Sequence, residues 1–320
     1  MRIVWVVAAW SLAACTPRKL IDATVSYAGL SDATFGELGT VPGLVTDLCV
    51  QRAQLEYMTV RVTGGKAPTT FAEFYAKAES VIGLPGAKTI TWKQHCGGYR
   101  VADDAFEAGL GSIAAYGGAL RDFATENATS QQGLEAIAAS ATTSAAALSA
   151  TDAQYKDALG GLATPIGMIA DAAKVKWKAR KLRGLVDKTD PALQEAIRIL
   201  GDFVGTVRSR QVRDLREALD VLRDDLEEIR EATGSKPYKI DLVTAMMIDI
   251  QMTERITQME SRLTALVELL KQLGAAHTEL RKGWDAGEDM GTDTLKTMRV
   301  LGKAIYDDIK AFRSAKGSPQ

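Results

Sequence analysis

Aromatic residues are scarce in this chain of 320 residues, and charge of neither sign prevails. Phe, Trp and Tyr make up 6% of the residues, which disfavours a β-sandwich, because such folds are rich in aromatic and β-branched side chains. The 39 basic and 40 acidic residues give a net charge of −1. No overall field therefore attracts the chain to nucleic acid or to an anionic membrane. The abundance of alanine favours closely packed helices instead.

Residues that commonly carry catalysis or bind metals are also few. The chain has two histidines, His95 and His277, whereas a zinc site needs three or four ligands at suitable spacing. Gly-x-Ser-x-Gly, His-Glu-x-x-His and dinucleotide-binding glycine patterns are absent from the sequence. Gly64-Gly65-Lys66 lacks the rest of a phosphate-binding loop and predicts a turn. The sequence thus predicts no enzyme, metal, cofactor or small-molecule substrate, and an active site without a known motif stays as an alternative.

The N-terminus carries the most specific motif. An uncharged run from Ile3 to Leu12 follows Met1-Arg2; it is too short to span a bilayer, which takes about 20 residues, and fits the apolar part of a secretory signal peptide. Leu12-Ala13-Ala14-Cys15 then resembles the lipobox of bacterial lipoproteins. The resemblance implies removal of residues 1–14 and a diacylglyceryl group on the Cys15 sulfur, with acylation of the new amine. The alternative is a hydrophobic N-terminal helix that ends in cysteine by chance.

The residue after Cys15 bears on which membrane receives the protein. Several acyl chains on one residue anchor stably, whereas a single chain binds marginally. Thr16 follows Cys15, and in enterobacterial lipoproteins an Asp at that position retains the protein in the inner membrane. The resemblance therefore implies a lipid anchor at the periplasmic face of the outer membrane.

Two cysteines remain once Cys15 is assigned to lipid. Cys49 and Cys96 form an even pair, and export places them in an oxidising compartment, so we expect a disulfide between them. Such a bridge would close a long loop, which loop-entropy arguments value at about 4 kcal/mol. The alternative is two separate buried thiols.

Glycines and prolines divide the mature chain. Residues 15–40 contain three glycines and precede Pro42, which predicts a lipidated tether. Residues 41–102 form a small region in which helices are expected over 44–62 and 71–81, with a strand or extended segment over 88–93 and a loop around His95. A helical bundle is expected over 103–315. Its first helix starts at Asp103-Asp104, and residues 316–320 form a disordered tail.

The cleanest periodicity lies in the second half of the chain. Apolar residues alternate at intervals of four and three, the period of a coiled-coil seam, from Leu193 to Ile229 and again from Met252 to Trp284. A restart at Asp190-Pro191 and a turn at Thr233 to Pro237 bound the first helix. The sequence predicts a mostly all-α, elongated bundle with a long antiparallel hairpin over 192–284. An amphipathic helix is expected over 295–312.

Two features of this half are candidate sites. His277 occupies a seam position, so we expect a structural role, with the polar seam residue Gln211 as its partner. A basic segment forms the other candidate and could bind anionic head groups or an acidic partner; it consists of Lys174, Lys176, Trp177, Lys178, Arg180, Lys181 and Arg183. The simpler interpretation, which we favour, is a solvated face that pairs with the acidic stretch 214–231.

The sequence as a whole resembles uncharacterised helical lipoproteins of Gram-negative bacteria, a type without a common activity. The leading hypothesis is a non-enzymatic, lipid-anchored envelope protein that presents a helical surface to a periplasmic protein or to its own copy. The alternative from another class is a membrane-active helical protein of the pore-forming kind. Its uncharged segments, 136–151 and 158–170, are short of large aliphatic side chains or broken by glycine and proline, so we expect no insertion.

Overall fold

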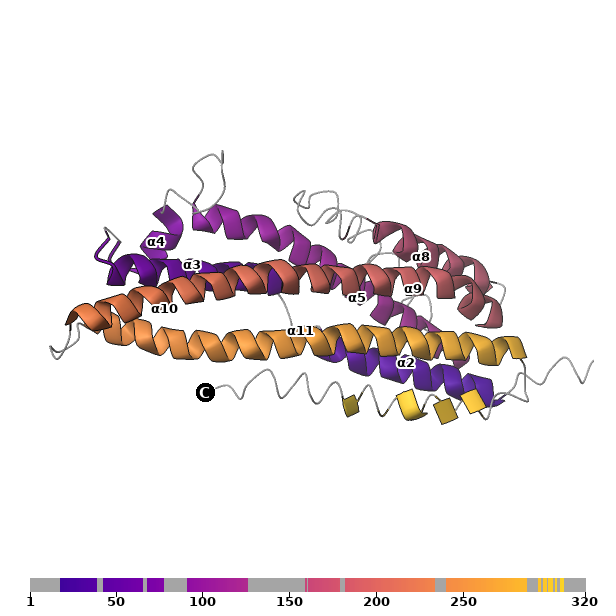
Figure 1. The fold of residues 1–320 in the computed structure, drawn as a ribbon. Helices are drawn as coiled ribbons and strands as arrows, with labels where there is room; N and C mark the ends of the chain where they lie inside the picture. Colours follow the sequence, from indigo (N-terminus) through magenta and orange to yellow (C-terminus); the bar gives the residue numbers. More distant parts are fainter. Residues whose placement is uncertain are drawn as a thin grey trace, which may run out of the picture.

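The computed structural model of the protein describes residues 18–38, 43–65, 68–77, 91–125, 159, 161–178, 182–233 and 240–286, with single residues between 293 and 307. Within these ranges the protein has eight α-helices, one π-helical turn and no strand. The helices lie side by side in an elongated bundle (Figure 1). The predicted all-α class and the bundle are confirmed.

A long antiparallel hairpin runs the length of the bundle. Helix α9 (Leu182–Val207) continues through the π-helical turn η1 (Arg208–Val212) into α10 (Arg213–Thr233), and α11 (Ile240–Ala286) returns beside them (Figure 1). Side-chain contacts between the two arms occur in opposite sequence order, at Asp190–His277, Gln194–Gly274, Arg216–Glu260 and Arg223–Asp249. The 47 residues of α11 span about 70 Å. The predicted hairpin is confirmed.

The hairpin has two halves. The hairpin base is α9 with residues 263–286, and the hairpin tip is α10 with residues 240–259. Seam residues of both halves are buried, and they include Leu193, Leu200, Val204, Leu215, Leu222, Met252, Leu266 and Leu273. The four-three spacing therefore buries a continuous apolar stripe on each arm.

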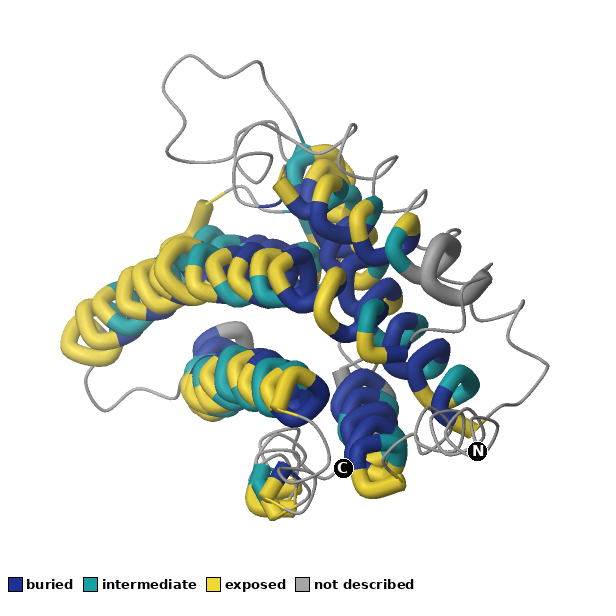
Figure 2. The backbone as a smooth tube through the Cα atoms, turned by 90° about the vertical axis from the view of Figure 1, so that its right-hand side faces the viewer, coloured by how far each residue is buried: buried dark blue, intermediate teal, exposed yellow. Residues whose placement is uncertain are grey.

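Three further helices pack around the base. These are α2 (Arg18–Leu38), α5 (Trp92–Ala124) and α8 (Ala163–Lys178). Seen along the bundle, their buried sides face one another and their exposed sides face outward (Figure 2).

The predicted tether over residues 15–40 is wrong for the part that the structure describes. Residues 18–38 form α2, which packs against α5 and α11. Its buried side carries Leu20, Ala23, Tyr27, Ala28, Ser31 and Phe35. These residues recur at helical intervals, and that periodicity outweighs the glycines on which the tether was predicted.

Three predictions for the N-terminal region are wrong, because α5 is longer than expected. Thr91 caps it in a capping box with Gln94, so residues 92–102 are helical and not strand or loop. The helix runs through the boundary that the sequence placed between residues 102 and 103. Asp103 does bind a helix N-terminus, but it belongs to α3 (Leu44–Val62), where the Asp103 carboxylate accepts hydrogen bonds from the Val45 and Thr46 amides.

The predicted disulfide is present. Cys49 of α3 and Cys96 of α5 are bonded, and both are buried. The short helix α4 (Phe71–Lys77) packs on this pair through aromatic contacts of Phe71 and Phe74 with Tyr57. The bridge thus joins the two helices that hold the N-terminal region to the bundle.

The predicted restart at Asp190-Pro191 is also wrong. Pro191 lies inside α9, which begins at Leu182. Proline in a helix removes one backbone hydrogen bond. Here the neighbours of Pro191 are fixed by side-chain contacts, because Asp190 binds α11 and Thr189 binds both α5 and its own helix. Predictions for residues 1–17, 126–158 and 308–320 lie outside the described residues.

Candidate functional site

An exposed apolar stripe lies on the hairpin tip. Val243, Met247 and Ile250 follow one another at helical intervals on α11 and are 45%, 57% and 69% exposed. The opposite side of the same helix buries Leu242, Ala245 and Met252. This part of α11 therefore has two apolar faces, of which one packs in the core and the other meets solvent. This exposed apolar stripe is therefore the candidate interaction surface.

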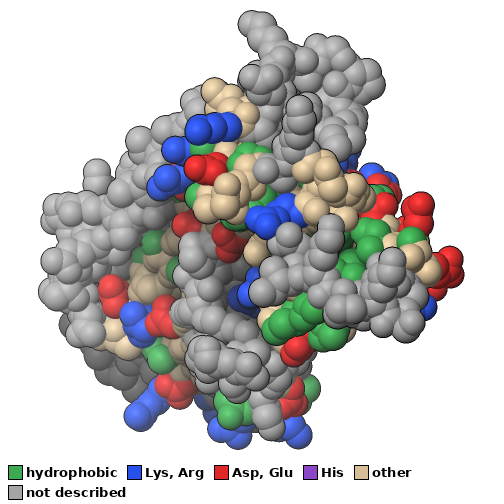
Figure 3. All heavy atoms as spheres, turned by 90° about the vertical axis from the view of Figure 1, so that its left-hand side faces the viewer, with side chains coloured by type: hydrophobic (Ala, Val, Ile, Leu, Met, Phe, Trp, Pro, Cys, Tyr) green, Lys and Arg blue, Asp and Glu red, His purple; other side chains and the backbone are tan. Residues whose placement is uncertain are grey.

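The hairpin tip is rich in acidic residues. Residues 220–254 contain nine acidic and four basic residues. On α10 the pKa of Asp225 is raised, first by partial burial and then by the neighbouring charges of Glu228 and Asp224. Figure 3 shows this end of the bundle, where hydrophobic side chains lie among charged ones. The stripe thus lies on a part of the hairpin that carries an excess of negative charge.

Contacts between α10 and α11 hold the tip together and leave the apolar stripe exposed. Arg223 of α10 binds Asp249 of α11 at 2.6 Å, and Leu219, Leu222 and Leu226 of α10 are buried. Half-exposed ion pairs contribute little to stability, so the buried leucines hold α10 in place. The apolar stripe therefore lies on a helix whose position is fixed by packing on its other face.

The start of α2 lies at the opposite end of the hairpin. The Trp284 indole N–H donates to Thr24 Oγ1 at 3.2 Å, and a Cβ added to Gly283 would lie 3.0 Å from Leu20. Helix α2 therefore begins beside the last turn of α11. Cys15 precedes Arg18 by three residues, a stretch that reaches at most about 10 Å. A lipid on Cys15 would be held near the base.

A buried polar network crosses the base. His277 is fully buried; its Nδ1 lies 2.8 Å from Asp190 Oδ1 and its Nε2 lies 2.8 Å from the Tyr116 hydroxyl. Burial lowers the pKa of His277 more than Asp190 raises it. The neutral ring therefore donates from Nδ1 to Asp190 and accepts the Tyr116 proton at Nε2. The predicted structural role fits this arrangement, but the predicted partner, Gln211, is wrong.

Asp190 is the charged member of this network. Burial opposes its ionisation, but hydrogen bonds from His277, Gln194 and Arg281 together hold its pKa below the ordinary value. Arg281 donates to its second oxygen at 2.7 Å. All carboxylate oxygens are thus bonded within the bundle, and the group joins α9 to α11 instead of facing a ligand.

The predicted basic segment is described only in part. Of its members, Arg183 has a described side chain, and this binds Asp285 at 3.4 Å. The predicted pairing with the acidic stretch 214–231 is therefore wrong for Arg183. Within that stretch, Asp214 binds Arg52 of α3, and Asp220 and Glu227 bind arginines of α10 itself. The remaining side chains of the basic segment lie outside the described residues, as does Cys15.

Sequence reasoning missed the apolar stripe because it followed only the seam. Val243, Met247 and Ile250 repeat at intervals of four and three, but off the seam that contains Met252. A second apolar series on one helix was the signal that could have found them.

Two absences hold for the described part of the chain. Among these residues, no cluster of three or more His, Cys, Asp or Glu side chains could hold a metal ion. Of the helices that the structure describes, none combines the length and the apolar character needed to cross a bilayer. The comparisons give no relative: no family model, no curated protein and no solved structure matches this chain.

Proposed function

We propose that the protein is a non-enzymatic lipoprotein of the bacterial outer membrane. In this proposal, lipid on Cys15 anchors the base at the periplasmic face, and the tip presents its apolar stripe to a protein partner. The observation that carries the proposal is the placement of α2 and the stripe at opposite ends of one hairpin. From Ile250 to Trp284 the helical rise amounts to about 50 Å. The bundle would act as a spacer between membrane and partner.

The chemistry of the tip selects the kind of partner. Two copies joined tip to tip would bring like charges together, because each tip carries excess negative charge. Helices that lie on bilayers generally carry Lys and Arg on their polar face, and this tip has the opposite charge. A periplasmic protein with an apolar surface and a basic rim fits both properties of the tip.

The anchor is tested by metabolic labelling with a fatty acid. We expect label in the wild-type protein and none in Cys15→Ser, which should appear in the soluble periplasmic fraction. Mass spectrometry of the mature N-terminal peptide should show acyl mass on Cys15. An unmodified N-terminal Met1, or cleavage at another residue, would contradict the anchor.

The partner surface is tested by photo-crosslinking in living cells. A photoreactive residue at position 247 should give one main adduct with another protein, and mass spectrometry should place the crosslink in a basic, apolar segment of it. Ile250→Asp should remove the adduct, since it places a negative charge within the stripe.

A matched control uses the same helix. A photoreactive residue at position 271, an exposed lysine of the base, should give no adduct with that protein. Equal adducts from both positions, or a crosslink between two copies of this chain through position 247, would contradict the proposed partner.

A further inference from the structure

A π-helical turn interrupts the first arm of the hairpin. Residues Arg208–Val212 form this turn between α9 and α10, and it widens the helix by one residue per turn. Such turns are frequent at functional sites, because the widened turn displaces side chains from the regular helical positions. In this protein the turn lies where base and tip meet, and it contacts both α11 and α3.

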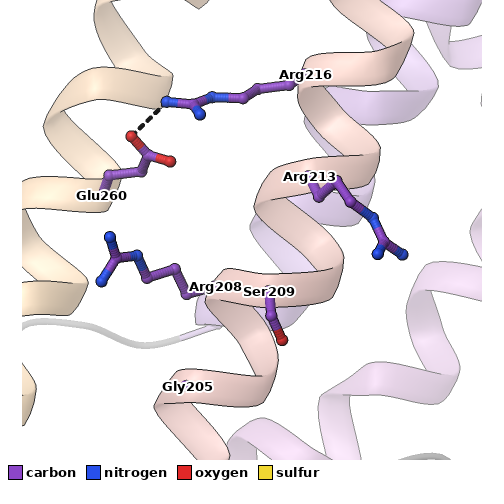
Figure 4. A pocket seen from close by; sticks show the side chains of 6 residues that line it. All are labelled: Gly205, Arg208, Ser209, Arg213, Arg216 and Glu260. Atoms are coloured by element: carbon purple, nitrogen blue, oxygen red, sulfur yellow. Dashed lines mark hydrogen bonds and ion pairs between the residues drawn. The ribbon is translucent and has the colours of Figure 1, made fainter.

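A cavity of about 350 Å³ opens beside the turn. Its lining comes from both arms of the hairpin (Figure 4) and consists of Gly205, Arg208, Ser209, Arg213, Arg216 and Glu260. Three of these six residues are arginines, and one is acidic. The volume lies at the lower end of the range for small-ligand sites.

Two of the arginines converge on the side that faces α11. Figure 4 shows Arg208 and Arg216 pointing to the side of Glu260 from turns on either side of Arg213, whereas Arg213 points away from it. Arg216 and Glu260 form an ion pair, and Arg213 lies 3.6 Å from both Asp214 and Glu217. Glu260 thus pairs with Arg216 and not with Arg208, which leaves an excess positive charge at this side of the cavity.

Arg208 supplies that excess. Its guanidinium has no ion pair or hydrogen bond with the described residues, although it lines the cavity. Guanidinium groups bind carboxylates and phosphates through two parallel N–H donors, so a pair of them around a cavity favours an oxyanion.

We propose that this cavity binds an oxyanion, the carboxylate or phosphate group of a small ligand, between Arg208 and Arg216. The bound group accepts hydrogen bonds from both guanidiniums, while Glu260 keeps Arg216 in place and competes with the ligand. The site is separate from the apolar stripe and does not depend on the proposed anchor or partner.

Calorimetric titration of the full-length protein in neutral detergent tests the site. The probes are inorganic phosphate, succinate and glycerophosphoglycerol, each at constant ionic strength. Saturable binding of phosphate or succinate supports the site and identifies the group of a soluble ligand. Binding of glycerophosphoglycerol alone also supports it and identifies a lipid headgroup. Absence of saturable binding for all three probes would overturn the proposal.

Variants distinguish this site from general attraction to arginines. Because charged hydrogen bonds are involved, Arg208→Gln should weaken binding about tenfold or more. Arg210→Gln is the matched control: it removes the same charge from the same turn, but Arg210 does not line the cavity. We expect it to change the affinity less than about twofold, because exposed charges are screened by salt. Equal losses in both variants would overturn the proposal.

Two more variants probe the cavity itself. Glu260→Gln should tighten binding, because it removes the competing carboxylate. Gly205→Leu should abolish binding by filling the space, since a Cβ on Gly205 meets no atom within 4 Å and the fold can accept the side chain. Unchanged affinity in a folded Gly205→Leu protein would place the bound anion elsewhere and contradict the site.

Discussion

At the base of the hairpin His277 and Asp190 are buried between helices, whereas at the tip Met247 and Ile250 lie in solvent. Both regions belong to the same pair of helices and share one apolar seam. The base is covered by α2 and α5, so polar groups inside it must find partners there, as His277, Asp190 and Tyr116 do. At the tip α3 packs on α10, and the second apolar face, with Val243, Met247 and Ile250 of α11, stays exposed. The base is therefore the region that holds the structure, and the proposed function assigns binding to the exposed face of the tip.

The largest difference in stability between base and tip should appear when one side chain is shortened in each region. His277→Ala removes one hydrogen-bond partner from Asp190 and one from Tyr116 and opens space in the core, so the free energy of unfolding should fall by about 3–5 kcal/mol. Met247→Ala shortens a side chain that is more than half exposed and should change the free energy of unfolding by less than about 0.5 kcal/mol. Urea denaturation at pH 7 measures both, and similar losses would invalidate the contrast between base and tip.

The disulfide tests how far the N-terminal helices depend on the bundle. Replacing Cys49 and Cys96 together by alanine should lower the free energy of unfolding by about 4 kcal/mol, because their loop spans 47 residues. The native protein treated with reductant should lose a similar amount. A loss below about 1 kcal/mol would show that packing of α3 on α5 and α10 suffices without the bridge.

Because helices approach closely in the base, replacing glycine by alanine should change the stability of the protein in opposite directions at two neighbouring positions. A Cβ on Gly117 would lie 2.5 Å from Ser31 Oγ of α2, whereas Gly118 faces open space. Gly117→Ala should therefore destabilise the protein by about 1–3 kcal/mol. Gly118→Ala should stabilise it by up to about 1 kcal/mol through helix propensity. Thermal unfolding of the two variants decides, and stabilisation by both would show that α2 does not approach α5 so closely.

A smaller, pH-dependent effect should arise at Glu56 of α3. Burial raises its pKa to about 7, although Arg52 and a hydrogen bond from Trp92 oppose this. The folded protein therefore binds a proton more tightly than the unfolded chain, and this contribution to stability is lost as pH rises from about 4.5 to 7. Glu56→Gln should remove that loss. The free energy of unfolding of the variant, relative to that of wild type, should therefore be about 1–2 kcal/mol higher at pH 8 than at pH 5.

Paired denaturation curves at the two pH values measure this effect. Glu56→Gln must be compared with wild type at each pH, because His277 contributes a pH dependence of the opposite sign. Its lowered pKa makes the protein less stable as the pH falls below the ordinary pKa of histidine. A difference between Glu56→Gln and wild type that does not change with pH would show that Glu56 stays ionised.

The hairpin and the disulfide could be predicted from the sequence because each rests on a simple rule. Leu263, Leu266, Leu270 and Leu273 repeat the seam period, and Cys49 and Cys96 form the one pair left after Cys15. The α2 helix was missed because glycines obscured its periodicity. The network of His277 was missed in part, because its partners Tyr116 and Asp190 come from segments far apart in the sequence, and only the packing of α5 on the hairpin brings them together.

The candidate sites were harder to predict than the fold. The apolar stripe depends on which face of α11 the other helices leave uncovered, and periodicity alone does not give that. The arginine cavity depends on the π-helical turn, since a regular helix would place Arg208 and Arg216 differently relative to Glu260. Both sites arise from the arrangement of helices and not from a motif.

The proposed function requires a base anchored at the membrane and a tip far from it, and energy transfer to a bilayer tests this arrangement directly. Lipidated protein is labelled with a donor at position 282 or at position 250 and reconstituted into vesicles that contain an acceptor lipid. The two positions differ by about 50 Å along α11. We predict strong transfer from position 282 and weak transfer from position 250. Equal transfer from both positions, or stronger transfer from position 250, would contradict the proposal that the tip extends away from the membrane.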